Sequence, residues 1–208
     1  DSFHPELDSE RKNIVIQIAG DMLDVRFPNC EYDDISYEEF LESFAAYIVE
    51  FSKLNVNYIF VPHIFKDLNI ISSLINKLPD NIRRECVAVA PYLVGQKGQD
   101  YIFDLYRKAD LVLGMRFHAN VCGLGLGKSC IGLVNYRQIE GLYDELKLND
   151  LKVHVNKKGF EDMLLSLSER ALSNSNSMNK NFLLEWRSKL DSFHYEINRI
   201  LDVSNNQL

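Results

Sequence analysis

The 208-residue sequence has few of the residues that form the disulfide bonds and metal sites of small proteins. It contains four cysteines, five prolines and one tryptophan, and no two cysteines form a CxxC pair. Three of the four (Cys30, Cys86, Cys122 and Cys130) lie in apolar runs. That setting is typical of buried, reduced thiols rather than of a zinc site or a disulfide framework. A chain of this length buries about 70% of the surface that its unfolded form exposes, so its fold needs no staple.

Long apolar segments and an excess of basic charge are absent too. No stretch approaches 18 uninterrupted apolar residues, so no membrane-spanning helix is expected. The first residues, DSFHPELDSERKN, lack the basic and apolar regions of a signal peptide. We therefore expect a cytoplasmic protein, either free or peripheral at the inner membrane. Twenty-three basic against 30 acidic residues give a net charge of −7, which disfavours nucleic acid as a partner.

What the sequence does contain is an alternation of short β-branched and amphipathic segments. Strands are predicted over residues 13–19, 56–61, 86–90, 111–113, 129–134 and 152–155. Helices are predicted from a capping box at Ser36 and Glu39, over 67–78, 99–108, 117–126 and 139–146, and from 159 to about 203 with a break at 173–177. This alternation predicts an α/β fold, a Rossmann-like doubly wound parallel sheet. We expect a donor-binding domain over residues 10–158. Helices over 159–208, including Trp186, would pack on it or on a missing half.

Ligands of such sheets bind beyond the carboxyl ends of the strands. The segments to inspect are therefore 19–24, 62–66, 91–96, 114–118 and 135–140. The run GLGLGKS at residues 123–129 is not among them, although it looks like a phosphate loop. Cys122 stands where that motif needs its first glycine, and the run precedes a strand instead of following one. It is expected to serve close helix–sheet packing and a helix-to-strand turn.

The informative segment is residues 109–120, ADLVLGMRFHAN. A buried strand ends at Gly114, and Arg116 and His118 follow at the start of the next helix. Free N–H groups and the positive end of a helix favour an anion there. Arg116 adds a fork suited to phosphate or carboxylate, and His118 can titrate near neutral pH. The alternative is an Arg116 paired with a local carboxylate such as Asp110, and a His118 that caps a backbone carbonyl.

This segment resembles the C-terminal domain of the polysaccharide pyruvyl transferase family, over roughly residues 10 to 150. The matching positions are Gly114, Arg116, Phe117 and His118, then the strand 129–134, Tyr136, residues 145–148 (ELKL), and VPH at 61–63 followed by Asp67. Gln138 departs from the family, which often has a lysine there, and Lys128-Ser129 replaces a small-Val-Pro run. Arg26 is a loose counterpart of the family's arginine after the first strand. The family's N-terminal half is absent, so we expect this chain to be the C-terminal half of a glycosyltransferase-B-like enzyme.

The resemblance implies transfer of a pyruvyl group from phosphoenolpyruvate to a sugar of a surface polysaccharide or its lipid-linked precursor, forming a ketal. It implies no cofactor and no metal. His118 would be the general acid or a charged donor to the phosphate, and Arg116 would bind the donor. Glu140 or Asp21 would accept the sugar proton. The further substrate-binding candidates are Phe117, Arg26, His63, Tyr136 and Glu140.

Other interpretations of these residues remain open. His63 could be a loop cap, and Asn135 and Tyr136 could simply pack. A nucleotide-sugar-binding glycosyltransferase domain is the main functional alternative, with Glu140 on the ribose and Arg116 on the pyrophosphate. A non-catalytic module of polysaccharide assembly is the third.

Overall fold

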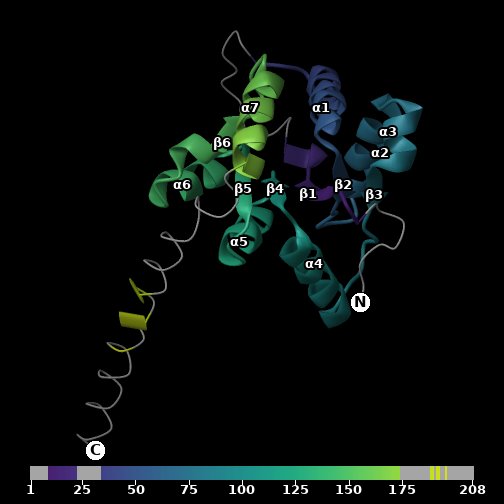
Figure 1. The fold of residues 1–208 in the computed structure, drawn as a ribbon. Coiled ribbons are helices and arrows are strands. Elements are labelled where there is room, and N and C mark those ends of the chain that lie inside the picture. The colour runs from purple at the N-terminus through teal and green to yellow at the C-terminus, as the bar shows by residue number, and fades with distance from the viewer. Residues whose placement is uncertain (1–8, 23–33, 174–187, 190, 193–194, 196–208) are drawn as a thin grey trace, which may run out of the picture.

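The computed structural model describes residues 9–22, 34–173, 188–189, 191–192 and 195 (Figure 1). Its centre is a six-stranded parallel sheet in the order β3-β2-β1-β4-β5-β6. The strands are β1 (Lys12–Gln17), β2 (Val56–Phe60), β3 (Val87–Val89), β4 (Leu111–Gly114), β5 (Ser129–Val134) and β6 (Lys152–His154). The predicted doubly wound parallel sheet is confirmed.

Seven α-helices in the described part of the chain connect and cover the strands. They are α1 (Tyr37–Phe51), α2 (Asp67–Lys77), α3 (Asp80–Glu85), α4 (Gln96–Lys108), α5 (Phe117–Gly125), α6 (Arg137–Glu145) and α7 (Phe160–Ser173). Figure 1 shows α1, α2 and α7 on one side of the sheet and α4 and α5 on the other. None of the helices described is both long enough and apolar enough to cross a membrane.

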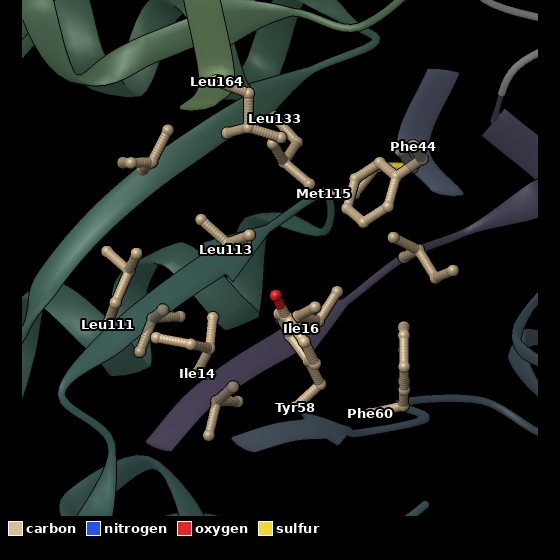
Figure 2. Packing of buried hydrophobic residues seen from close by; sticks show 14 of the residues in the cluster. Ile14, Ile16, Phe44, Tyr58, Phe60, Leu111, Leu113, Met115, Leu133 and Leu164 are labelled. Carbon is tan, nitrogen blue, oxygen red and sulfur yellow. The ribbon is translucent and has the colours of Figure 1, made fainter. Parts of the chain in front are cut away.

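The sheet's apolar residues alternate between its two faces. Figure 2 shows Ile14, Leu113 and Leu133 from three neighbouring strands pointing to the same side, where Phe44 of α1 and Leu164 of α7 meet them. These five side chains are fully buried. Period-two alternation in each strand thus places one set of side chains under α1 and α7, as a sheet covered on both faces requires.

Helix α7 completes the layer on that face. The ring of Phe160 stacks on Phe40 of α1 with centroids 5.6 Å apart. The hydroxyls of Tyr47 in α1 and Ser168 in α7 are hydrogen-bonded at 2.9 Å. The beginning of the C-terminal region therefore belongs to the same core as the sheet.

Two local predictions are confirmed in detail. The Ser36 hydroxyl accepts from the N–H of Glu39 at 3.2 Å, and the Glu39 carboxylate accepts from the N–H of Ser36 at 2.8 Å, so the capping box exists. A Cβ on Gly123 would lie 3.1 Å from the Cys130 sulfur, and Gly127 has a φ of 70°. The glycine-rich run therefore serves close packing and a turn, as expected.

The strand order reverses at the centre of the sheet. From β1 the chain proceeds outward through β2 and β3, and from β4 it proceeds in the opposite direction through β5 and β6. The carboxyl ends of β1 and β4 thus lie side by side where the order reverses, with Gln17 paired to Gly114. Ligands of open α/β sheets bind at this topological switch point.

Candidate functional site

Arg116 lies at the switch point because the turn after β4 holds it there. It is the N-cap residue of α5, and its N–H donates to the side-chain oxygen of Gln17 at 2.7 Å. The Asn120 amide donates to the carbonyls of Gly114 and Arg116 at 2.8 and 2.9 Å. A Cβ on Gly114 would lie 2.9 Å from that amide, so the turn requires a glycine.

The Arg116 guanidinium is held between two carboxylates. Its Nε and Nη2 donate to the Asp67 oxygens at 3.0 and 2.5 Å, and Nη2 also donates to Asp21 at 2.8 Å. Burial lowers the pKa of Arg116, but the bonds to Asp67 and Asp21 outweigh burial and raise the pKa overall. The sequence-based alternative that Arg116 pairs with a carboxylate is thus confirmed. Its example of a partner, Asp110, is wrong, because Asp110 accepts from the N–H of Asn13 at 2.7 Å instead.

Asp67 connects three strand ends. This fully buried carboxylate at the start of α2 accepts from Arg116, from the Gln17 side chain at 3.2 Å, and from the N–H groups of His63 and Ile64 at 3.0 and 3.1 Å. Pairing and hydrogen bonding of this kind offset the cost of burying a carboxylate. Asp67 thereby fixes the ends of β1, β2 and β4 relative to one another.

His63 follows β2 and is half-buried. Its Nε2 is hydrogen-bonded to the hydroxyl of Tyr106 in α4 at 2.9 Å. Burial lowers the pKa of His63 to about 4; the nearby Asp67 opposes this shift, while Arg116 and His118 add to it. Asp67 joins the loop after β2 to the turn after β4, because it accepts from the N–H of His63 and from the Arg116 guanidinium.

His118 lies in the first turn of α5 and its side chain is exposed. Its ring meets that of Phe117 edge-on, with centroids 6.0 Å apart. The N–H of Phe117 donates to the hydroxyl of Tyr136 at 3.0 Å. Tyr136 is buried, so its contact in the site is with the backbone of α5.

One predicted residue, Glu140, lies elsewhere. The Glu140 carboxylate is 3.5 Å from Nε2 of His154 and 4.0 Å from Nζ of Lys152, on the β6 side of the sheet. Asn135 is fully buried, and neither polar atom of its side chain has a partner within the described ranges. Arg26 lies outside the described residues.

Sequence reasoning missed Gln17 as a site residue and mentioned Asp67 only as part of a resemblance. Each had a signal: Gln17 is a polar residue at the end of an apolar strand, and Asp67 is the first residue of the helix that follows the second strand. Among the residues described, no three histidine, cysteine, aspartate or glutamate side chains are grouped so that they could hold a metal ion.

Comparison with solved structures gives the same fold. A UDP-GlcNAc 2-epimerase from Methanocaldococcus jannaschii superposes with a TM-score of 0.55 at 17% identity, over 89% of this chain and 46% of the epimerase. The ADP-heptose heptosyltransferase II of E. coli gives 0.54 at 11% identity, over 80% of this chain and 48% of that enzyme. The chain thus spans less than half the length of these proteins. At such identities the likeness concerns the fold alone.

Comparison of sequences identifies the family. No curated protein matches the chain significantly. The sequence profile described as polysaccharide pyruvyl transferase matches residues 4–136. This range includes the switch point of the sheet, with Asp67, Arg116 and His118. The chain belongs to the polysaccharide pyruvyl transferase family.

Proposed function

We propose that this chain binds phosphoenolpyruvate and takes part in transfer of its pyruvyl group to a sugar of a surface polysaccharide or its lipid-linked precursor. The observation that carries the proposal is the position of Arg116 at the switch point of the sheet, where Asp67 joins it to the N–H of His63 and where His118 is exposed in the first turn of α5. The family membership supports the same reaction class.

The donor is a small molecule with a phosphate and a carboxylate, so its site needs cations and N–H donors. Arg116 supplies a guanidinium at the first turn of α5, where the helix end favours negative charge. The bonds to Asp67 fix the plane of that guanidinium before the ligand arrives. A group held in advance loses less entropy on binding.

The reaction joins C2 of the donor to two sugar hydroxyl oxygens and releases phosphate. The methylene carbon gains a proton and becomes a methyl group, C2 passes through an oxocarbenium-like state, and the C2–O bond to phosphate breaks. Of the two hydroxyl protons lost by the sugar, one balances the proton gained by carbon and the other leaves with phosphate. The exposed imidazole of His118 is our candidate for the general acid that protonates the methylene carbon.

A second half-domain is part of the proposal. Phe65, Leu93 and Val94 follow β2 and β3 at the same sheet edge as Arg116, and their side chains are 69, 41 and 76% exposed. Phe65 packs its ring edge-on against Tyr92, with centroids 6.1 Å apart. Adjacent exposed apolar side chains mark a contact surface. We expect the second half to cover this edge and to contribute to the acceptor site.

The test is calorimetric titration with phosphoenolpyruvate and, separately, with uridine diphosphate and guanosine diphosphate. The proposal predicts binding of phosphoenolpyruvate, and a His118→Gln variant that still binds it but no longer transfers the pyruvyl group in the complete enzyme. Preferential binding of a nucleoside diphosphate would favour the nucleotide-sugar alternative. Unchanged transfer by His118→Gln would remove the acid role from His118.

A further inference from the structure

The two carboxylates on Arg116 are held very differently. Asp67 is fully buried, makes two bonds to the guanidinium, and accepts from three other donors. Asp21 makes one bond, to Nη2, and its side chain is 38% exposed. Within the described residues, Arg116 is the sole hydrogen-bond partner of the Asp21 side chain. Asp67 is therefore a fixed part of the site, whereas Asp21 can leave it at little cost.

Asp21 occupies one of the positions on the guanidinium at which an anionic ligand can bind. Its oxygen lies 2.8 Å from Nη2, which is the distance at which a phosphate or carboxylate oxygen binds a guanidinium. Asp21 sits in the turn η1 (Gly20–Met22) after β1, and Arg116 follows β4. The contact therefore lies at the switch point, where ligands of such sheets bind. Two anions cannot share that place, because like charges at this separation repel.

We propose that the Asp21 carboxylate occupies the subsite at which Arg116 binds an anionic group of the donor, and that the donor displaces it. This inference rests on the proposed function for the identity of the donor, but the subsite itself is defined by anion chemistry. Without a donor, Asp21 then occupies the N–H of Nη2 that Asp67 leaves available. It competes with the ligand instead of assisting it.

The opposite signs expected for the two carboxylates make the idea testable. Removing the charge of Asp21 frees Nη2 and strengthens anion binding. Removing the charge of Asp67 releases the guanidinium from its fixed orientation and weakens anion binding. If only the net charge mattered, the anion affinities of the Asp21 and Asp67 variants would change in the same direction.

The experiment is calorimetric titration of the full chain with phosphoenolpyruvate, inorganic phosphate and pyruvate. Asp21→Asn is expected to bind tighter by about two- to fivefold, the range for loss of one partly exposed ion pair. Inorganic phosphate carries only the phosphate group of the donor, and pyruvate carries only its carboxylate. The ligand that binds Asp21→Asn more tightly than the wild type identifies the group that occupies the subsite. Asp80→Asn is the matched control, because Asp80 pairs with Arg83 and Arg84 in α3 and its loss changes the net charge equally.

Unchanged or weaker binding by Asp21→Asn would overturn the proposal, as would an equal gain in Asp80→Asn or the absence of anion binding in every protein. The melting temperature of Asp67→Asn is measured together with its affinity, because this variant loses a buried charge. If Asp67→Asn is unfolded, the result for Asp21→Asn alone decides. A gain for phosphate without any preference for phosphoenolpyruvate would support the subsite and contradict the proposed function. Specific binding of phosphoenolpyruvate with the same affinity in the wild type and in Asp21→Asn would support the proposed function and contradict the subsite.

Discussion

Arg116 links stability to function, because its charge balances a carboxylate that water does not reach. The side chain of Arg116 is 13% exposed and that of Asp67 is 0% exposed. From the sequence alone, Arg116→Ala is expected to abolish donor binding without unfolding the protein, since the residue would sit on an exposed strand end. The structure corrects this expectation, because alanine would leave Asp67 buried without its cation.

Arg116→Ala should therefore lower the free energy of unfolding by about 3 kcal/mol, the cost of breaking a buried ion pair. Urea denaturation monitored by circular dichroism measures this change. Arg116→Lys keeps the charge but loses the two-pronged geometry, so it should lose less stability while still impairing donor binding. Equal stability of the wild type and the alanine variant would contradict the pairing with Asp67.

Asp67→Asn should also lower the free energy of unfolding by about 3 kcal/mol, because the Arg116 guanidinium then lacks its buried counter-charge. The matched control is Asp104→Asn, which removes an exposed partner of Arg107. An exposed pair is worth about 0–1 kcal/mol. Similar losses in the two variants, measured by urea denaturation, would show that Asp67 is no more important than a surface carboxylate.

His63 should make stability depend on pH. Its folded pKa of about 4 is below the unfolded value of 6.5, mainly because the ring is desolvated. The unfolded chain therefore binds more protons between these values, and the free energy of unfolding falls as pH decreases from 6.5 to 4. A shift of this size corresponds to about 3 kcal/mol at most.

His63→Gln should flatten this part of the profile, whereas His154→Gln, which replaces a histidine beside Glu140, should keep it. Urea denaturation at a series of pH values from 4 to 7 measures both. A wild-type profile that is flat over this range would contradict the burial of a neutral imidazole.

At the scale of residues, the sequence singled out Arg116 and His118 as candidates but did not predict the partners of Arg116. Arg116 and His118 are recognisable because they directly follow a buried strand. Asp67 and Asp21 are 49 and 95 positions away from Arg116, and nothing local connects them. Their contact depends on which strands lie next to each other, which a single sequence does not specify.

Helix α6 packs so closely on β5 that one position admits only glycine. A Cβ on Gly132 would lie 2.4 Å from the ring of Tyr143. The Tyr143 hydroxyl donates to Asn120, the residue that holds the turn at Arg116. Helices α5 and α6 are thus coupled through a buried polar contact directly behind the site.

Gly132→Ala should destabilise the protein by about 1–3 kcal/mol through overpacking. Gly141→Ala, in α6, is its matched partner: the added Cβ meets nothing within 4 Å, and alanine is the better helix former. That variant should be more stable by up to about 1 kcal/mol. Thermal unfolding of both variants measures the difference, and equal melting temperatures would contradict the close packing.

At the scale of elements, periodicity predicted the strands to within one or two residues. It missed α3, because Pro79 and the charged run after it show no apolar period over so short a helix. It also began α4 at Gln99, whereas the helix starts at Gln96 after Gly95, whose φ of 76° ends the preceding loop. Whether a short, charged helix forms, and where it begins, depends more on the residues that pack against it than on its own apolar pattern.

At the scale of the whole molecule, the reversal of strand order between β1 and β4 creates the site. The alternation of strands and helices predicted a doubly wound sheet but could not give the order of its strands. After each helix, the next strand can be added on either side of the strands already in place. The sequence therefore indicated five candidate loops at the strand ends. The structure joins those after β1, β2 and β4 into one cluster through Asp67 and Arg116.

The most direct test of donor binding at Arg116 is a titration of phosphoenolpyruvate with the full chain, monitored by its phosphorus NMR signal. We predict that the signal shifts and broadens with the wild type and with Arg107→Lys, which alters an exposed arginine of α4. Arg116→Lys should leave the signal nearly unchanged. An equal response to all three proteins, or none to the wild type, would contradict binding of the donor at the switch point.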